Sequence, residues 1–76
     1  MDKDLTYCKI LRDLREDHDL KQADLAELLH TTQQVYSRYE TGMHGLPIRH
    51  LITLCRYYGV SADYILGLTQ DPTPRD

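Results

Sequence analysis

The residues best suited to specific polar recognition lie in the stretch TTQQVYSRYETG, residues 31–42. In a helix that starts at Gln33 and turns by about 100° per residue, Val35, Tyr36 and Tyr39 share one side. The opposite side is a continuous polar stripe formed by Gln33, Gln34, Ser37, Arg38 and Thr41. A glutamine amide can form two hydrogen bonds with the major-groove edge of adenine, and an arginine can do the same with guanine. This stretch therefore carries the side chains that a base-reading helix needs.

Most surface helices expose a polar face, so the elements around this stripe decide how it is interpreted. Apolar residues recur at three- and four-residue spacing, which predicts helices over about residues 6–17, 22–29, 33–41, 47–58 and 62–66. Thr32 and Ser61 are good N-caps for the third and fifth of these helices. Pro47 suits the first position of the fourth helix, while Gly42 and Gly59 suit the ends of the third and fourth. No segment alternates with a period of two, so we expect an all-α domain.

The fourth predicted helix has an extended apolar face. That face consists of Ile48, Leu51, Ile52, Cys55 and Tyr58, and we expect it to be buried. Tyr57 falls about 180° from Ile48 on the helical wheel, alongside His50 and Thr53, and is expected to be exposed. The tyrosines that fall on apolar faces, and are therefore expected in the core, are Tyr7, Tyr36, Tyr39 and Tyr58.

Length and composition limit the chain to one small module. It has 76 residues, of which 41% are apolar and 28% charged, as expected for a folded domain with one modest core. Residues 1–69 are expected to form the domain and residues 70–76 a flexible polar tail. No apolar run is long enough to span a membrane, and the first residues lack the layout of a signal peptide, so we expect a cytoplasmic protein. Cys8 and Cys55 are expected to be reduced core thiols.

Charge is distributed unevenly along the chain. The formal net charge is −3, yet residues 31–58 hold three Lys/Arg against one Asp/Glu and are the only net-positive part. Residues 1–30 hold five Lys/Arg against eight Asp/Glu, and residues 59–76 hold one against three. The acidic total argues against strong non-specific attraction to nucleic acid, whereas a local basic face would still attract a polyanion.

Other kinds of chemistry find little support. His18, His30, His44 and His50 form neither an i, i+4 pair on one helix nor a set with a CxxC motif, so no metal site is expected. The chain has no glycine-rich phosphate loop and no GxSxG nucleophile elbow. We therefore expect a protein that is not an enzyme, with no cofactor and no small-molecule ligand.

Residues 22–42, QADLAELLHTTQQVYSRYETG, resemble the helix-turn-helix of the XRE family, which is similar to the phage repressors and Cro proteins. The resemblance continues through LPIRHLITLCRYYGVSADYILGLT and covers about residues 7–69. It implies a compact five-helix, lambda-repressor-like domain that usually binds DNA as a dimer on a roughly palindromic operator. It also implies that Gln33, Gln34, Ser37 and Arg38 face bases, and that Gln22 and Thr32 contact phosphates at helix N-termini.

Two positions depart from the family pattern. His30 stands in the turn where the family commonly has glycine, which indicates a left-handed residue with some strain. Lys21 replaces the Ser or Thr that usually caps the second helix, so either a bound phosphate or water takes the place of the cap.

Further candidate contacts lie around the stripe. Lys21 and Thr41 are expected to contact phosphates, and so are His44 and Arg49 in and after the loop that follows the third helix. For His44 and Arg49 simple solvation is the alternative, and Lys9 and Arg15 are weaker candidates. Tyr64 and Leu68, near the end of the domain, are the residues through which we expect a homodimer to form.

Two functions remain open at this point. The first is a sequence-specific double-stranded DNA-binding transcriptional regulator, expected to be a repressor, that reads the major groove with helix 33–41. The second is a protein-interaction module of the same fold with weak or no DNA binding, such as an adaptor, an anti-repressor or an antitoxin-like protein. The acidic first third of the chain favours the second function. The third helix favours the first, because its only acid, Glu40, is expected at the edge of the polar stripe.

Overall fold

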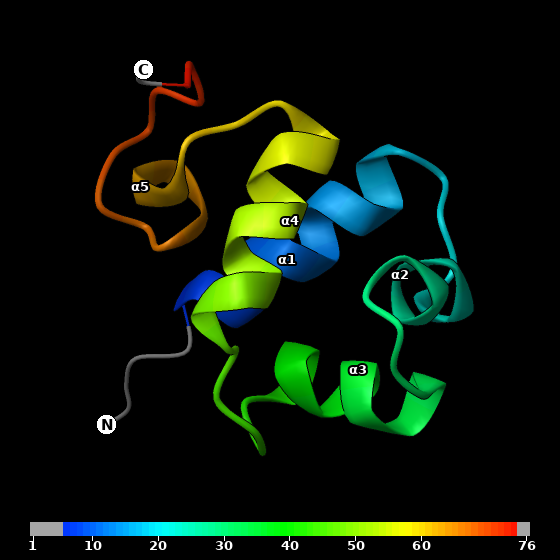
Figure 1. Cartoon of the computed structure of the whole chain (residues 1–76). Helices are drawn as coiled ribbons and strands as arrows, with labels where there is room; N and C mark the ends of the chain where they lie inside the picture. The colour runs from blue at the N-terminus through cyan, green and yellow to red at the C-terminus, as the bar shows by residue number, and fades with distance from the viewer. Residues whose placement is uncertain (1–5, 75–76) are drawn as a thin grey trace.

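Figure 1 shows the fold as a computed structural model, in which residues 6–74 are described. Over this range the chain forms five helices: α1 (Thr6–Asp17), α2 (Gln22–Leu28), α3 (Gln33–Thr41), α4 (Ile48–Tyr58) and α5 (Ala62–Ile65). The described range contains no strand. The predicted all-α, five-helix domain is confirmed, and each boundary agrees to within one residue. The predicted domain (residues 1–69) and tail (residues 70–76) extend beyond the described residues at their outer ends.

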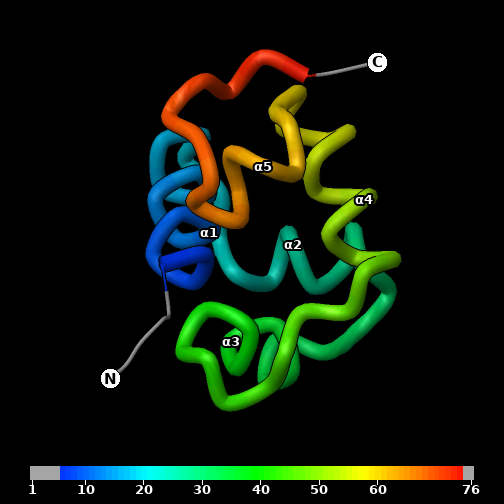
Figure 2. The backbone as a smooth tube through the Cα atoms, turned by 90° about the vertical axis from the view of Figure 1, so that its left-hand side faces the viewer, coloured from blue at the N-terminus to red at the C-terminus, as the bar shows by residue number. Residues whose placement is uncertain are grey.

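One hydrophobic core lies where the five helices meet, as the two perpendicular views show (Figures 1 and 2). Its buried members come from every helix and the adjoining turns: Leu11, Leu14, Leu25, Ala26, Leu29, Tyr36, Tyr39, Leu54, Val60 and Ile65. Tyr36 is fully buried and meets Tyr39 edge-on with 6.2 Å between ring centroids. Because both tyrosines belong to α3, this helix contributes its whole apolar side to the core and leaves its polar side for other contacts.

The helix ends follow the predicted local chemistry. The Thr32 hydroxyl accepts a hydrogen bond from the Val35 backbone N–H at 3.1 Å, and the Ser61 hydroxyl accepts one from the Tyr64 N–H at 3.0 Å. Gly42 ends α3 with a φ of 84°, a left-handed conformation that glycine adopts without steric cost. His30 is left-handed as well, with a φ of 56°, as predicted for the turn between α2 and α3. Local sequence signals therefore fix both ends of α3.

The orientation of α4 differs from the prediction. Ile48 and Ile52 were expected in the core, but they are 74% and 46% exposed. The buried residues of α4 are His50 and Leu54, and the His50 ring packs 5.8 Å from the ring of Tyr39. Tyr57 is half exposed as predicted, whereas His50, expected beside it on the exposed side, is buried. The helical wheel identifies residues that share a face, but it does not determine which face meets the core.

The segment after α5 returns to the domain. The Ser61 backbone N–H donates a hydrogen bond to the Pro72 carbonyl oxygen at 2.9 Å, so the described part of the predicted tail is tied to the start of α5. Figure 2 shows this segment crossing above α5 toward the end of α4. Residues 70–74 are exposed, in keeping with their polar composition. No helix among residues 6–74 is long and apolar enough to cross a membrane.

Candidate nucleic-acid interface

Helix α3 forms one end of the molecule. In both views it lies below α1, α2 and α4, with no other element beyond it (Figures 1 and 2). A short turn around His30 connects it to α2, and the two helices pack against each other. This is the helix-turn-helix arrangement, in which the second helix presents its outer face to a partner.

The polar stripe predicted on α3 lies on this outer face. Gln33, Gln34, Arg38 and Thr41 are exposed, while Ser37 is half-buried. The side chains of Gln33, Gln34 and Arg38 form no hydrogen bond or ion pair with any residue of the described chain. Their donors and acceptors are therefore available for a partner. The geometry brings the four predicted base-contacting residues together on one continuous surface.

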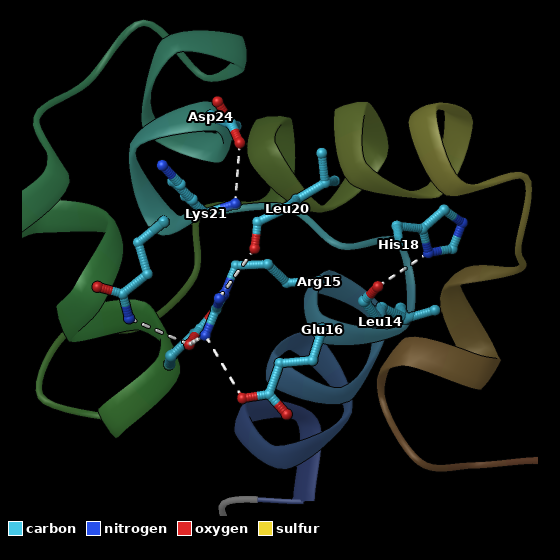
Figure 3. Close-up of polar contacts among 9 residues, drawn as sticks. Leu14, Arg15, Glu16, His18, Leu20, Lys21 and Asp24 are labelled. Carbon is cyan, nitrogen blue, oxygen red and sulfur yellow. Dashed lines mark hydrogen bonds and ion pairs between the residues drawn. The ribbon is translucent and has the colours of Figure 1, made fainter.

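Glu40 is the residue of α3 for which the prediction was wrong. Its charge was expected at the edge of the polar stripe, but the residue is only 4% exposed. Arg15 on α1 donates two hydrogen bonds to its carboxylate, at 2.8 Å and 3.2 Å, and the Gln22 amide donates a third at 3.2 Å. Figure 3 shows Arg15 at the centre of these contacts, where it also donates to the Leu20 carbonyl at 3.1 Å. The acid is thus turned inward, away from the stripe.

This buried cluster has two consequences for charge. Burial alone would raise the pKa of Glu40, but the hydrogen bonds from Arg15 and Gln22 outweigh that effect and hold the pKa below its usual value. Glu40 is therefore ionised at neutral pH and neutralised by Arg15. Because Glu40 is the only acid in residues 31–58, the exposed charges of this segment are the arginines Arg38, Arg49 and Arg56. The local basic surface is stronger than the sequence count implied.

The cluster was missed by the sequence analysis, although a signal for it exists. Arg15 follows the buried Leu11 by four residues, and Glu40 follows the buried Tyr36 by four. Residues separated by four positions lie on the same side of a helix, so both charges occupy core-facing positions. Two opposite charges at core-facing positions of two helices indicate a pair. Arg15 is consequently not available as a phosphate contact, and Lys9 is engaged with Asp13 at 2.8 Å.

The residues expected to contact phosphate lie around both ends of α3. Thr32 caps the first turn, and Arg49 borders a shallow hollow together with Thr31 and Val35, near the same end. Thr41 and His44 lie at the other end, where the His44 backbone N–H donates to the Arg38 carbonyl at 3.2 Å. These four residues are exposed. The Thr32 hydroxyl accepts from Val35 and still has its own hydrogen to donate.

The start of α2 differs in one respect from the expectation. Lys21 provides no side-chain cap, as predicted, and its own charge is exposed. Its backbone N–H donates to the Asp24 carboxylate at 2.8 Å, a contact visible in Figure 3. The Gln22 amide is directed to Glu40 rather than outward, and the residue is half-buried. A carboxylate in the first turn of α2 offsets the positive end of the helix, so the Lys21 side chain is the stronger phosphate candidate of the two.

The two residues proposed for a dimer contact have different surroundings. Tyr64 is half-buried and packs against the core, whereas Leu68 is 72% exposed and its backbone N–H donates to the Asp63 carbonyl at 2.8 Å. No group of three or more His, Cys, Asp or Glu side chains within residues 6–74 is arranged to hold a metal ion.

Comparisons with known proteins agree with this geometry. A family model described as helix-turn-helix matches residues 11–65, which is more than half of the chain. The chain is 45% identical over 69 residues to the uncharacterized HTH-type transcriptional regulator YobD of Bacillus subtilis, and the match covers 91% of this chain and 62% of that protein. A crystal structure of a transcriptional regulator from Listeria innocua superposes with a TM-score of 0.79 at 31% identity, covering 86% of this chain and 61% of the other. This chain thus spans about three fifths of each relative.

Proposed function

This chain belongs to the helix-turn-helix family, in agreement with its resemblance to XRE proteins. From that premise we propose that it is a transcriptional regulator that binds double-stranded DNA at specific sequences. The observation that carries the proposal is the outer face of α3. Gln33, Gln34, Ser37 and Arg38 form an accessible surface there, at one end of the molecule. Amide and guanidinium groups that have no partner among residues 6–74 are suited to base edges in the major groove, which is wide enough to admit a helix. An enzymatic role has no support from the family.

Electrostatics supports the same orientation toward DNA. With Glu40 neutralised, the segment that contains α3 and α4 exposes arginines and no acid among the described residues. Exposed polar or basic side chains lie near both ends of α3, and we expect them to contact phosphates on either side of the bases that the helix reads. The proposed phosphate contacts are Lys21, Thr32, Thr41, His44 and Arg49. Gln22, expected among them from the sequence, is left out because its amide donates to Glu40. Neutralisation of phosphates releases counterions, so binding should weaken steeply as salt is raised.

A homodimer on a palindromic operator completes the proposal. One module presents four base-reading side chains, which specify only a few base pairs, and two copies related by a two-fold axis would read two half-sites about 34 Å apart. We propose that the dimer represses transcription by occupying a promoter in the cytoplasm. The two relatives described as transcriptional regulators support a regulatory role.

Selection from random duplex DNA with the purified protein tests this function. Anisotropy titrations of the enriched duplex and a scrambled one would follow, at two salt concentrations. We expect enrichment of a paired half-site that is bound about 10³-fold or more tighter than the scramble. A selection that enriches nothing, with only weak salt-sensitive binding, would instead favour the protein-interaction module.

A further inference from the structure

A hollow of about 580 Å³ lies between the turn that joins α2 to α3 and the first turn of α4. In Figure 2 the connection from α2 to α3 runs beside the start of α4. The polar residues that line this hollow are His30, Thr31, Arg49, His50 and Thr53, and the apolar part of the lining consists of Leu28, Leu29, Val35 and Tyr39. Sites for small molecules commonly have volumes of about 300–1,000 Å³. The hollow, which we call the α2–α4 hollow, is therefore large enough for a small ligand.

The charge of the α2–α4 hollow indicates the sign of that ligand. No Asp or Glu is among the residues that line it. Arg49 supplies a permanent positive charge, and its guanidinium forms no hydrogen bond or ion pair with any residue of the described chain. The apolar groove on the other side of α4 differs, because both Arg56 and Asp63 line it. The α2–α4 hollow thus favours an anion, whereas the groove has no preferred sign.

His50 is a buried polar side chain of this hollow that has no hydrogen-bond partner among residues 6–74. It is only 8% exposed, and its ring packs 5.8 Å from the ring of Tyr39. Burial, and secondarily the charge of Arg49, lower the pKa of His50, so the ring is neutral near pH 7. A neutral imidazole still has one N–H to donate, and a buried donor without an acceptor is unfavourable. A hydrogen-bond acceptor that entered the hollow would remove this cost.

The remaining donors around the hollow suit the same kind of ligand. Arg49 and His50 belong to the first turn of α4, where free backbone N–H groups and the helix dipole favour negative charge. The half-buried Thr31 has a hydroxyl without a hydrogen bond among the described residues, and His30 is exposed beside it. Guanidinium, imidazole and hydroxyl donors around one hollow match the several acceptor oxygens of a phosphoryl group.

We propose that the α2–α4 hollow binds the phosphoryl group of a small phosphorylated molecule, with Arg49 and His50 as its main contacts and Leu28 and Val35 against the rest of the ligand. This site was not expected from the sequence, which indicates no small-molecule ligand. The DNA backbone is the other source of phosphate. A phosphate within a duplex can reach the exposed Arg49, whereas the buried His50 is accessible to a small ligand that enters the hollow.

The expected consequence of this binding is competition with DNA. Arg49 is also a proposed contact of the DNA backbone, and it cannot pair with a bound ligand and with the duplex at the same time. A phosphorylated ligand should therefore weaken binding to the operator. This consequence rests on the proposed function, although the site itself does not.

A nuclear magnetic resonance titration of the full chain with inorganic phosphate tests the site. The pH is fixed, and sodium chloride keeps the ionic strength constant. We expect the ring signals of His50 to shift saturably in the millimolar range, because a bound anion favours the protonated ring. Arg49→Gln should weaken phosphate binding by about tenfold or more, whereas Arg56→Gln, which removes another exposed arginine of α4, should leave it unchanged. No saturable shift of His50, or equal losses in the two variants, would overturn the proposal.

Two phosphate monoesters test the apolar part of the site. Phenyl phosphate should bind more tightly than methyl phosphate, because its ring can be buried against Leu28 and Val35. Val35→Ala should reduce that difference without changing the affinity for inorganic phosphate. Equal affinities of the wild-type chain for the two esters would contradict the proposed contact with these apolar side chains.

Duplex DNA distinguishes the two sources of phosphate. We expect inorganic phosphate to weaken wild-type binding to the selected duplex more than sodium chloride does at equal ionic strength, and Arg49→Gln to abolish this excess. If the duplex shifts the His50 signals and free phosphate does not, the hollow serves the DNA backbone and the proposal is wrong. If the wild-type chain binds no selected duplex, the proposed function fails, and the phosphate titration still decides the site.

Discussion

Helices α3 and α4 are both amphipathic, yet they use their faces in opposite ways. Helix α3 buries Tyr36 and Tyr39 and exposes its polar stripe. Helix α4 buries His50 together with Leu54 and exposes two isoleucines. Sequence periodicity is equally clear in both, so it cannot be what sets the orientation of a helix about its axis.

The two helices differ in the hydrogen bonds that their buried polar side chains form. The orientation of α3 is fixed by Glu40, whose carboxylate receives three hydrogen bonds from α1 and α2 in the core-facing direction. A buried charge tolerates little rotation, because each lost hydrogen bond leaves an unpaired ion. The buried side of α4 holds no ion pair among the described residues, and His50 meets Tyr39 only through its ring. Among the described residues, the buried side of α4 therefore lacks a contact that fixes its orientation as Glu40 fixes that of α3.

Removal of the charge at Glu40 should have the largest effect. Glu40→Gln removes the buried carboxylate that accepts two hydrogen bonds from Arg15, and leaves only the exposed Glu16 near that guanidinium. We expect this change to lower the free energy of unfolding by about 3–5 kcal/mol. Urea unfolding followed by circular dichroism at low temperature measures this loss. Glu16→Gln is the matched control, because Glu16 lies 3.9 Å from the same arginine but is 60% exposed at its side chain. A loss no larger than that of the control would mean that the ion pair does not fix α3.

The same pair predicts a pH dependence. The pKa of Glu40 is lowered in the folded state, so its contribution is complete above the unfolded value of about 4.3 and is lost as the pH falls through the folded value. The difference in stability between the wild-type chain and Glu40→Gln should therefore be constant near neutrality and shrink in acid. A difference that stays constant down to about pH 3 would contradict the ionised pair.

The two sides of α4 can be compared by truncation. Leu54 is fully buried, and Leu54→Ala should cost about 2–5 kcal/mol because it removes buried methyl groups and leaves a cavity. Ile48→Ala removes a similar volume from a largely exposed position and should change the stability of the monomer by less than about 0.5 kcal/mol. Thermal unfolding of both variants and the wild-type chain at one low protein concentration measures both changes. Equal losses would mean that the apolar side of α4 faces the core after all.

The sequence predicted what local chemistry determines. Thr32 and Gly42 mark the ends of α3 because a hydroxyl cap and a left-handed glycine act within a few residues of the chain. The polar stripe also followed from the sequence, because Tyr36 and Tyr39 are large enough to define the buried side of α3 without knowledge of their neighbours.

The remaining features depend on contacts between distant residues. Arg15 and Glu40 are 25 positions apart, so nothing in the stretch around either residue identifies its partner. The buried His50 of α4 has Tyr39 of α3 as its aromatic neighbour, and nothing in the sequence around either residue identifies this contact. The hydrogen bond from Ser61 to Pro72 likewise joins a helix start to a segment whose composition predicts only a tail. Such features follow from packing, and sequence patterns on single helices do not contain them.

Substitutions on α3 and at the start of α2 distinguish base reading from phosphate contact. Gln34→Ala should cost about 1–3 kcal/mol on the selected duplex and relax the preference at one or two base pairs. Lys21→Ala should weaken binding to all sequences alike and reduce the salt slope by about one. Anisotropy titrations against single-base variants of the duplex, at several salt concentrations, measure both effects. The stripe would not read bases if the two substitutions weakened every duplex to the same extent.

A small effect is expected from the hydroxyl at the start of α3. Thr32→Ala removes the oxygen that accepts the Val35 N–H, and should lower the free energy of unfolding by about 1 kcal/mol. Thr53→Ala is the matched control on α4. The Thr53 hydroxyl donates to the Arg49 carbonyl within the helix at 3.0 Å. Such a bond adds little to the free energy of unfolding, because the carbonyl already accepts a hydrogen bond within the helix. Urea unfolding of both variants should therefore show a loss for the α3 substitution only. If the two substitutions lower the free energy of unfolding equally, the hydroxyl of Thr32 is not needed to start α3. Its role would then be contact with phosphate, and titration of Thr32→Ala against DNA would show a loss of affinity.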